Sequence, residues 1–370
     1  MADIFVGMVP ALLPEIRKEF GLTLVGGAAL ITTMYLVSNL AQMPVGHLRA
    51  KKTKPLFLPL GMILAASMSL LAMLPRTGLG EVWIFMLVVV ASLGTGLTHP
   101  EAFRAVHRLD GIAASTSTAV FMIGGMLGFG LGAWISTVLV SGWGLRGLLV
   151  LGPVSLVAVG MLYLLKIRLA VEEEQSENET EKPERRASFW PIWLMTIPTS
   201  IATTVILGLL PTRLEEMGFE LEYGGFSNML FISGAIVGTL FWAGVSRNRN
   251  KIGTSTVALI LGVPFLVAHL IFIEQRWAAW LLVPGGFCVM AAFPLLVTEA
   301  RFARGLNLGG RMAMSAGGTW GAASVAFLLF GVMADHWGIA AVLRWMWIGY
   351  PFSAFIGLYI IRKRLFNNRN

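Results

Sequence analysis

The sequence is poor in charge, in cysteine and in histidine, and each shortage excludes a class of protein. Charged residues make up 13% of the 370 positions, which is about half of the share in a soluble domain. The one cysteine, Cys288, has no partner for a disulfide, and the five histidines do not share zinc-ligand spacing with it. We therefore expect no disulfide framework, no metal and no cofactor.

Long apolar runs take the place of the missing charge. Hydrophobic residues make up 56% of the chain, and a run of about 20 apolar residues crosses the hydrocarbon core of a bilayer as a helix. The pattern predicts an all-α, polytopic membrane protein. We expect twelve spans, at 1–13, 24–48, 55–74, 82–100, 113–139, 146–165, 189–211, 225–245, 254–273, 278–297, 312–334 and 339–361.

The positive charge gathers in every second break between the spans. One set of breaks carries 21 of the 28 Lys and Arg residues, and such a bias over short loops marks the cytoplasmic side. The sequence therefore predicts a multi-pass protein of the plasma (inner) membrane with both termini in the cytoplasm. The net charge of +8 does not indicate nucleic-acid binding, because the basic residues form no domain-sized patch.

The two halves of the chain resemble each other. Glu101 and Glu299 lie 198 positions apart at matching span ends, and Trp143-Gly144 matches Trp337-Gly338. We expect a six-helix bundle at 1–165, a flexible charged linker at 166–188 and a second six-helix bundle at 189–370. Similar six-helix halves are typical of secondary transporters. The first span is short by comparison with the seventh, which suggests that some ten to twelve residues are missing before Met1.

Four stretches resemble one known family. They are Asp3–Pro14 in the first span, Thr98–Ala102 in the fourth, Gly124–Gly130 in the fifth and Gly144–Gly147 before the sixth. With the twelve-span layout, they resemble the major facilitator superfamily, and within it the fosmidomycin-resistance efflux group. The resemblance implies an antiporter that exports a drug-like or phosphonate substrate against proton influx and gives antibiotic resistance. Ala50 departs from the family, which usually has an aspartate of the cytoplasmic gating pair at this position.

A few ionisable residues in or near the spans are candidates for proton coupling or gating. A charged group inside a bilayer is a functional candidate by default, and a carboxylate near an imidazole can titrate near neutral pH. Each also has a structural alternative, such as an interfacial ion pair or a solvated chain end. The candidates are Asp3, His99, Glu101, Arg104 and Glu299.

Span two carries a polar stripe. Thr32, Tyr35, Asn39 and Gln42 follow one another at intervals of 3, 4 and 3 residues, which places them on one face of a helix. The stripe could line a substrate cavity or bind the helix to its neighbours through hydrogen bonds; both interpretations stay open here.

The glycines of span five favour a structural explanation. Gly124, Gly128 and Gly132 are spaced by four, a pattern that lets two helices cross closely. No strand precedes them and no Gly-Lys-Ser/Thr follows, so they predict no phosphate-binding loop. With no ATP site, the energy for transport must come from a gradient.

Together these features favour a secondary active transporter, not an enzyme. We expect alternating access and proton-coupled efflux of a small molecule by a monomer in the lipid bilayer. The alternative is an uptake symporter, which no residue pattern excludes. A membrane-embedded enzyme or a sensor is a remote alternative, because the spans show no nucleophile and base pair and the linker is too short for an output domain.

Overall fold

The computed structural model describes residues 1–48, 52–106, 108, 114–170, 187–247, 249–306 and 308–367. Helices dominate these residues, and no strand occurs among them beyond an isolated bridge between Ser188 and Arg304. The all-α prediction is confirmed. Ala50 and residues 171–186 of the expected linker lie outside the described residues.

Two compact units make up the chain. Unit 1 contains Met1–Ser176 and Pro211–Met229, and unit 2 contains Glu177–Leu210 and Leu230–Asn370. The helices of unit 1 are α1 (Ala2–Ala11), α2 (Leu13–Phe20), α3 (Leu24–Leu48), α4 (Phe57–Ala66), η1 (Ser67–Met73), α5 (Gly80–Val106), α6 (Ala114–Trp143), η2 (Gly144–Val150) and α7 (Leu151–Leu164).

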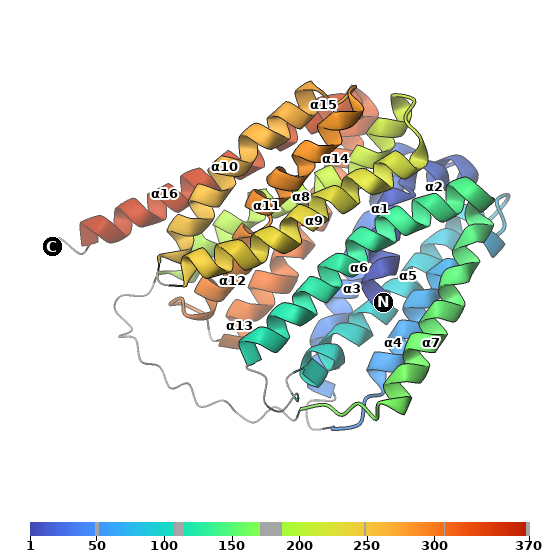
Figure 1. Cartoon of the computed structure of the whole chain (residues 1–370), viewed down its shortest axis with the longest axis horizontal. Coiled ribbons are helices and arrows are strands. Elements are labelled where there is room, and N and C mark those ends of the chain that lie inside the picture. Colours follow the sequence, from blue (N-terminus) through green and yellow to red (C-terminus); the bar gives the residue numbers. More distant parts are fainter. Residues whose placement is uncertain are drawn as a thin grey trace. The chain divides into compact units, whose positions relative to one another are not determined.

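Unit 2 begins with most of α8 and ends with α16 (Figure 1). The C-terminal end of α8 and the N-terminal end of α9 belong to unit 1. The helices are α8 (Phe189–Glu216), α9 (Leu221–Ser246), α10 (Lys251–Ile271), η4 (Arg276–Leu281), α11 (Leu282–Val289), α12 (Ala292–Arg301), α13 (Leu308–Ala313), the π-helix η5 (Met314–Gly318), α14 (Thr319–Trp337), α15 (Ile339–Met346) and α16 (Gly349–Asn367).

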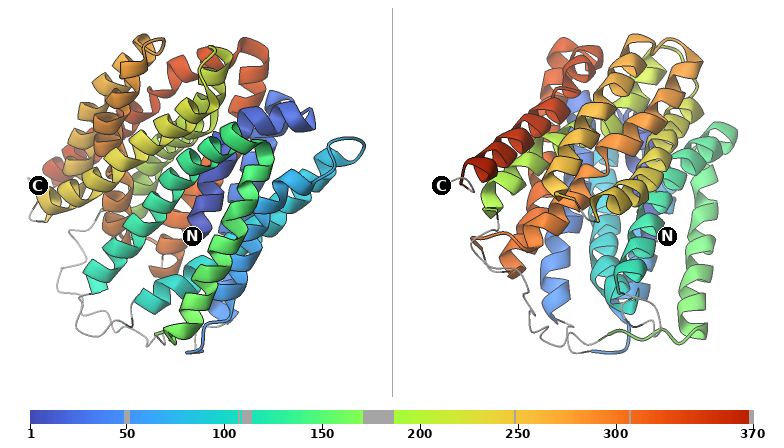
Figure 2. Two further views of the ribbon diagram at one scale, coloured as in Figure 1. Left: turned by 45° about the vertical axis from the view of Figure 1, so that its right-hand side comes forward. Right: turned by 60° about the vertical axis from the view of Figure 1, so that its left-hand side comes forward.

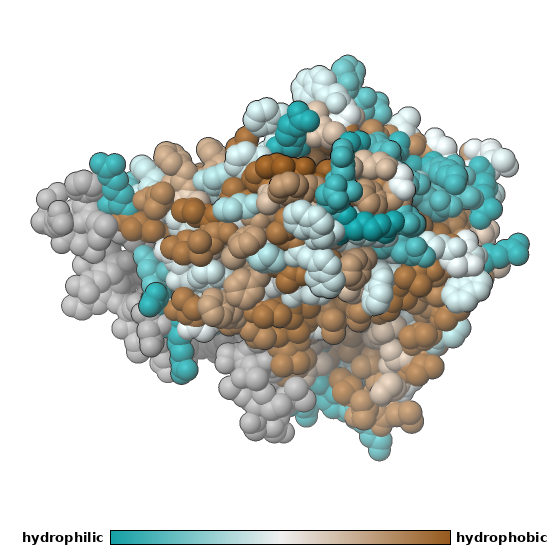
Figure 3. All heavy atoms as spheres, turned by 45° about the horizontal axis from the view of Figure 1, so that its top comes forward, coloured by the Kyte–Doolittle hydropathy of each residue, from teal (hydrophilic) through white to brown (hydrophobic). Residues whose placement is uncertain are grey.

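Each of the twelve predicted spans coincides with a helix, or with a run of consecutive helices, in the described chain. Eight helical stretches there are long and apolar enough to cross a membrane, and Ala2–Ala11 and Phe57–Met73 are shorter apolar helices. Large hydrophobic side chains are exposed on many of them, such as Val120, Leu156 and Leu329, and hydrophobic residues cover much of the face in Figure 3. Such a surface suits lipid rather than water.

Unit 1 is built by close helix crossings. α1 packs on α6, while α5 packs on α3 and α4, and α4 also packs on α7; Figure 2 shows α4, α5 and α7 side by side. At the first crossing, a Cβ added to Gly132 would collide with the carbonyl oxygen of Ile4, and one on Gly128 would lie 3.2 Å from Cβ of Asp3. The predicted close crossing is therefore confirmed at Gly128 and Gly132, whereas a Cβ added to Gly124 would meet no atom of another element within 4 Å.

The repeated Trp-Gly pair has the same backbone role in both halves. Gly144 ends α6 with φ +60°, and Gly338 ends α14 with φ +83°. A residue with a side chain rarely adopts this region, so glycine suits both turns. The sequence match between the halves thus corresponds to a matching helix end.

Candidate functional site

Asp3 and His99 form an ion pair between α1 and α5. Oδ1 of Asp3 lies 3.2 Å from Nε2 of His99, and both side chains keep 26% of their surface exposed. The other ring nitrogen of His99, Nδ1, lies 2.9 Å from the carbonyl oxygen of Thr95, one turn back on α5. The structure therefore brings together two of the five residues that the sequence singled out for proton coupling.

The two contacts of His99 fix where protons must sit. A backbone carbonyl only accepts hydrogen bonds, so Nδ1 carries a hydrogen toward Thr95. Asp3 and Nε2 can then form a hydrogen bond only if one further proton lies between them, on the imidazole or on the carboxyl group. Without that proton, a lone pair faces a carboxylate. The two distances therefore fit a pair that shares one proton.

Helix α6 fixes the position of this pair on one side. A Cβ added to Gly125 would lie 3.4 Å from Oδ2 of Asp3, so the glycine surface of α6 runs directly past the carboxyl group. The ring of Phe121, also on α6, meets the ring of His99 edge to face, with centroids 6.4 Å apart. Sequence reasoning missed this aromatic neighbour, because nothing in the spacing of α6 distinguishes Phe121 from other apolar residues.

The carboxylate of Glu101 accepts hydrogen bonds from the start of α4. Its side chain is 1% exposed, and Oε2 accepts hydrogen bonds from the backbone N–H groups of Leu56 and Leu58 at 2.9 and 2.8 Å. These residues begin α4, whose first N–H groups have no partner within the helix. A carboxylate at this place also complements the positive end of the helix dipole. Glu101 thus caps α4, whereas His99 makes its ion pair with Asp3.

Arg104 fastens two chain segments at the same end of unit 1. Its guanidinium donates to the carbonyl oxygen of Ala170 through Nε at 2.8 Å and through Nη2 at 2.6 Å, and Nη2 also donates to the carbonyl of Lys52 at 2.8 Å. A backbone hydrogen bond joins the same two segments, since the N–H of Leu169 donates to the carbonyl of Thr53. The chain that leaves α7 is therefore bound to the end of α5 and to the segment before α4.

A cap formed by a side chain is also present in the second half. Oδ1 of Asn250 accepts from the N–H groups of Ile252 and Gly253 at 3.0 and 3.4 Å and so caps α10 from its own N-terminus. Glu299, which matches Glu101 in the repeat, is half-buried on α12. The two glutamates therefore occupy matching sequence positions, and Asn250 caps α10 in the second half.

The polar stripe of span two lies along α3. Thr32 is buried, and Tyr35, Asn39 and Gln42 are half-buried. Nδ2 of Asn39 donates to the carbonyl oxygen of Tyr35 at 2.8 Å, within the same helix. The side-chain amide of Asn39 therefore makes a hydrogen bond within α3 itself.

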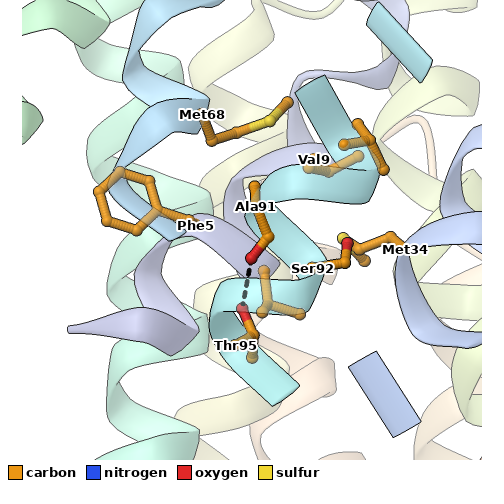
Figure 4. A pocket seen from close by; sticks show the side chains of 9 residues that line it. Phe5, Val9, Met34, Met68, Ala91, Ser92 and Thr95 are labelled. Atoms are coloured by element: carbon orange, nitrogen blue, oxygen red, sulfur yellow. Dashed lines mark hydrogen bonds between the residues drawn. The ribbon is translucent and has the colours of Figure 1, made fainter. Parts of the chain in front are cut away.

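Unit 1 also contains a small, partly open cavity that the sequence did not predict. Its volume is about 10 Å³, and it lies among α1, α3, η1 and α5 (Figure 4). Ser92 and Thr95 supply the hydroxyl groups of its wall. The full lining is Phe5, Val6, Val9, Met34, Met68, Val88, Ala91, Ser92 and Thr95.

The interior of unit 2 joins its helices with neutral hydrogen bonds. The hydroxyls of Thr196 and Thr319 lie 3.1 Å apart, and those of Thr203 and the fully buried Tyr350 lie 3.2 Å apart. Nε1 of Trp193 donates to the carbonyl oxygen of Met314 at 2.8 Å, where the π-helix η5 begins. The threonine-rich run of α8 could have indicated this network from the sequence.

Two further residues that the sequence offers for chemistry are buried. Nδ1 of His269 lies 2.9 Å from the carbonyl oxygen of Ala278, whereas its Nε2 is buried without a hydrogen-bond partner. Cys288 is buried and free. Among the described residues, no group of three or more His, Cys, Asp or Glu side chains could hold a metal ion.

Comparison with known protein families gives one match that covers most of the chain. The model of the Major Facilitator Superfamily matches residues 1–301. The fosmidomycin resistance protein of Escherichia coli (strain K12) is 23% identical over 366 residues, which is 92% of this chain and 86% of that protein. An uncharacterized MFS-type transporter of Bacillus subtilis (strain 168), YfnC, is 24% identical over 189 residues, or 50% of this chain and 46% of that one.

Solved transporter structures share the fold. A bacterial homolog of the human lysosomal transporter Spinster, in an inward-facing and occupied conformation, matches with a TM-score of 0.69 and 11% identity over 100% of this chain and 94% of its own. A POT family transporter in complex with a thioalcohol-conjugated peptide matches with a TM-score of 0.73 and 14% identity, over 98% of this chain and 94% of that one. At such identities the likeness concerns the fold alone.

Proposed function

Because the chain belongs to the major facilitator superfamily, we propose that it is a secondary active transporter that exports a small molecule in exchange for protons. The observation that carries the proposal is the ion pair of Asp3 and His99, which needs one exchangeable proton to hold α1 against α5. The relative that is named for fosmidomycin resistance supports export as the direction.

Proton exchange at this pair can be coupled to a change of shape. With the proton present, the carboxylate and the imidazolium attract each other across 3.2 Å. Once the proton leaves, His99 presents a lone pair to a carboxylate at the same distance, and repulsion replaces the attraction. The two groups must then separate or take up water. We expect this change to favour one of the two states of an alternating-access cycle.

The remaining candidate residues have different parts in this proposal. The polar stripe on α3, formed by Thr32, Tyr35, Asn39 and Gln42, lines the substrate cavity of the first six-helix bundle. Glu101 and Arg104 hold the predicted cytoplasmic end of that bundle together through their hydrogen bonds. We assign Glu299 to gating in the second bundle.

Transport in everted membrane vesicles tests the proposal. The vesicles are acidified inside by respiration, and a pH-sensitive dye reports the movement of protons after fosmidomycin is added as the probe. Efflux by exchange moves protons out of the vesicles as the drug enters. We expect Asp3→Asn and His99→Gln to slow this signal by about 100-fold, since each removes a group that takes or gives the proton.

Glu101→Gln is the matched control, because it neutralises a neighbouring carboxyl group of the same helical bundle that caps α4. It should retain proton-coupled transport. Equal dye responses in Asp3→Asn and the parent protein would remove the proton assignment. A response of the opposite sign, in which the drug carries protons inward with it, would show the uptake symporter.

A further inference from the structure

The cavity of unit 1 contains a hydroxyl group that lacks a partner. Oγ of Ser92 is buried without a hydrogen-bond partner, and the residue is 2% exposed. Thr95 Oγ1 makes only a long bond of 3.3 Å, to the carbonyl oxygen of Ala91, which Figure 4 shows beside the cavity. A buried hydroxyl without a partner is costly, so this wall is suited to a small polar molecule. A volume of about 10 Å³ has room for one water molecule.

The cavity lies one helical turn from the Asp3–His99 pair on both helices that form the pair. On α1, Val6 of the cavity wall follows Asp3 by three residues, and on α5, Thr95 precedes His99 by four. One turn of an α-helix rises 5.4 Å, which about two O–H···O hydrogen bonds of 2.8 Å can span. A chain of two hydrogen bonds, from a water in the cavity to one hydroxyl and from that hydroxyl to the pair, is therefore long enough to span this distance.

We propose that this cavity binds one water molecule through the hydroxyls of Ser92 and Thr95, and that this water relays protons between the Asp3–His99 pair and the predicted outer side of the membrane. The proposal rests on the proposed function. The direction follows from α5, which runs from the predicted outer side at Gly80 toward Arg104, so that Ser92 and Thr95 precede His99 along it.

The relay conserves atoms and charge. An incoming proton joins the water, a second proton of that water passes to the oxygen of Thr95, and the hydroxyl proton of Thr95 passes to the pair. Each oxygen ends as it began after the groups rotate. Among the described residues, the titratable groups with an electrostatic effect on His99 are Asp3 and the amino group of Met1; the element packed from the side of α6 presents the ring of Phe121.

Radiolytic footprinting tests for the water without any substrate. A millisecond X-ray pulse makes hydroxyl radicals from bound water, and these oxidise methionine beside it, which mass spectrometry detects. Met34 and Met68 line the cavity at 3% and 1% exposure, whereas Met8 is equally buried at 0% and does not line it. We expect Met34 and Met68 to be oxidised several times faster than Met8 in the full-length protein.

Two variants attack the site in different ways. Ser92→Ala removes a polar partner, and Val88→Ile fills the cavity while both hydroxyls remain; each should lower the oxidation of Met34 and Met68 to the level of Met8. Val90→Ile is the control, because Val90 is 38% exposed on the same helix and does not line the cavity. Oxidation of Met34 and Met68 at the rate of Met8 in the parent protein would overturn the water site.

The vesicle assay with fosmidomycin tests the relay. Ser92→Ala should slow the pH-driven signal by about tenfold, the effect of one lost hydrogen bond, while exchange of the drug at equal pH on both sides stays unchanged. A merely structural serine would slow both together, which would overturn the relay. If Asp3→Asn abolishes coupling and Ser92→Ala does not, the relay alone is wrong. If Asp3→Asn keeps proton coupling, the proposed function itself is wrong. The footprinting experiment tests the water site independently of that result.

Discussion

Replacing Glu101 with alanine removes the cap of α4 without changing any group of the Asp3–His99 pair. Two N–H groups, of Leu56 and Leu58, lose the carboxylate oxygen that accepts from both. The bond from Leu58 is buried, whereas that from Leu56 is partly buried. Water can therefore reach Leu56 after the substitution, but it reaches Leu58 with difficulty.

The expected loss follows from these two bonds. A buried donor that loses its partner costs about 1–3 kcal/mol, and hydrogen bonds to charged groups lie at the upper end. Allowing for hydration of the N–H of Leu56, we expect Glu101→Ala to lower the free energy of unfolding by about 2–4 kcal/mol. Glu101→Gln keeps an acceptor but loses the charge, so its loss should be smaller, at about 1–2 kcal/mol.

Asn250→Ala provides a matched comparison in the second half. Asn250 caps α10 with bonds of 3.0 and 3.4 Å, the longer of them exposed, and loss of such a cap costs about 1 kcal/mol. Unfolding by SDS in mixed micelles, followed by tryptophan fluorescence, measures all three variants. If Glu101→Ala destabilises the protein no more than Asn250→Ala does, the assignment of Glu101 as a buried cap is refuted.

Three further substitutions have distinct expected outcomes. Gly132→Val should lower stability by about 1–3 kcal/mol through overpacking at the crossing of α1 and α6, measured by SDS unfolding, and should also weaken proton coupling in vesicles. Arg104→Lys cannot reproduce the two-pronged contact with Ala170, so amide hydrogen exchange at Ala170 should speed up. Tyr350→Phe should cost only about 0.6 kcal/mol in SDS unfolding, because it removes one neutral bond to Thr203, and should leave coupling unchanged.

The sequence predicts the helices of this protein better than the partners of its charged residues. The spans follow from apolar runs, because each run must satisfy its backbone hydrogen bonds within one helix. The pairing of Asp3 with His99 has no such local cause. It depends on how α1 and α5 pack across a separation of 96 positions, and no periodicity within either helix encodes that contact.

His99 and Glu101 are two positions apart along the chain but contact different helices. Residues two apart on a helix point to different faces, so these two side chains reach different neighbours. His99 faces Asp3 on α1, and Glu101 faces the first turn of α4. Helical spacing alone could have separated them, whereas the identity of each partner required the packed bundle.

The glycine contacts bear on which helices separate in the proposed proton cycle. At Gly132 the backbone of α6 touches the backbone of Ile4 on α1, and at Gly128 it lies against Cβ of Asp3. A slide of α1 along α6 would break this direct contact between the two helices. Helix α5 meets α1 through the side chains of Asp3 and His99, which can rotate and take up water. We therefore expect α1 and α6 to move together, and the contact between α1 and α5 to open and close with the proton.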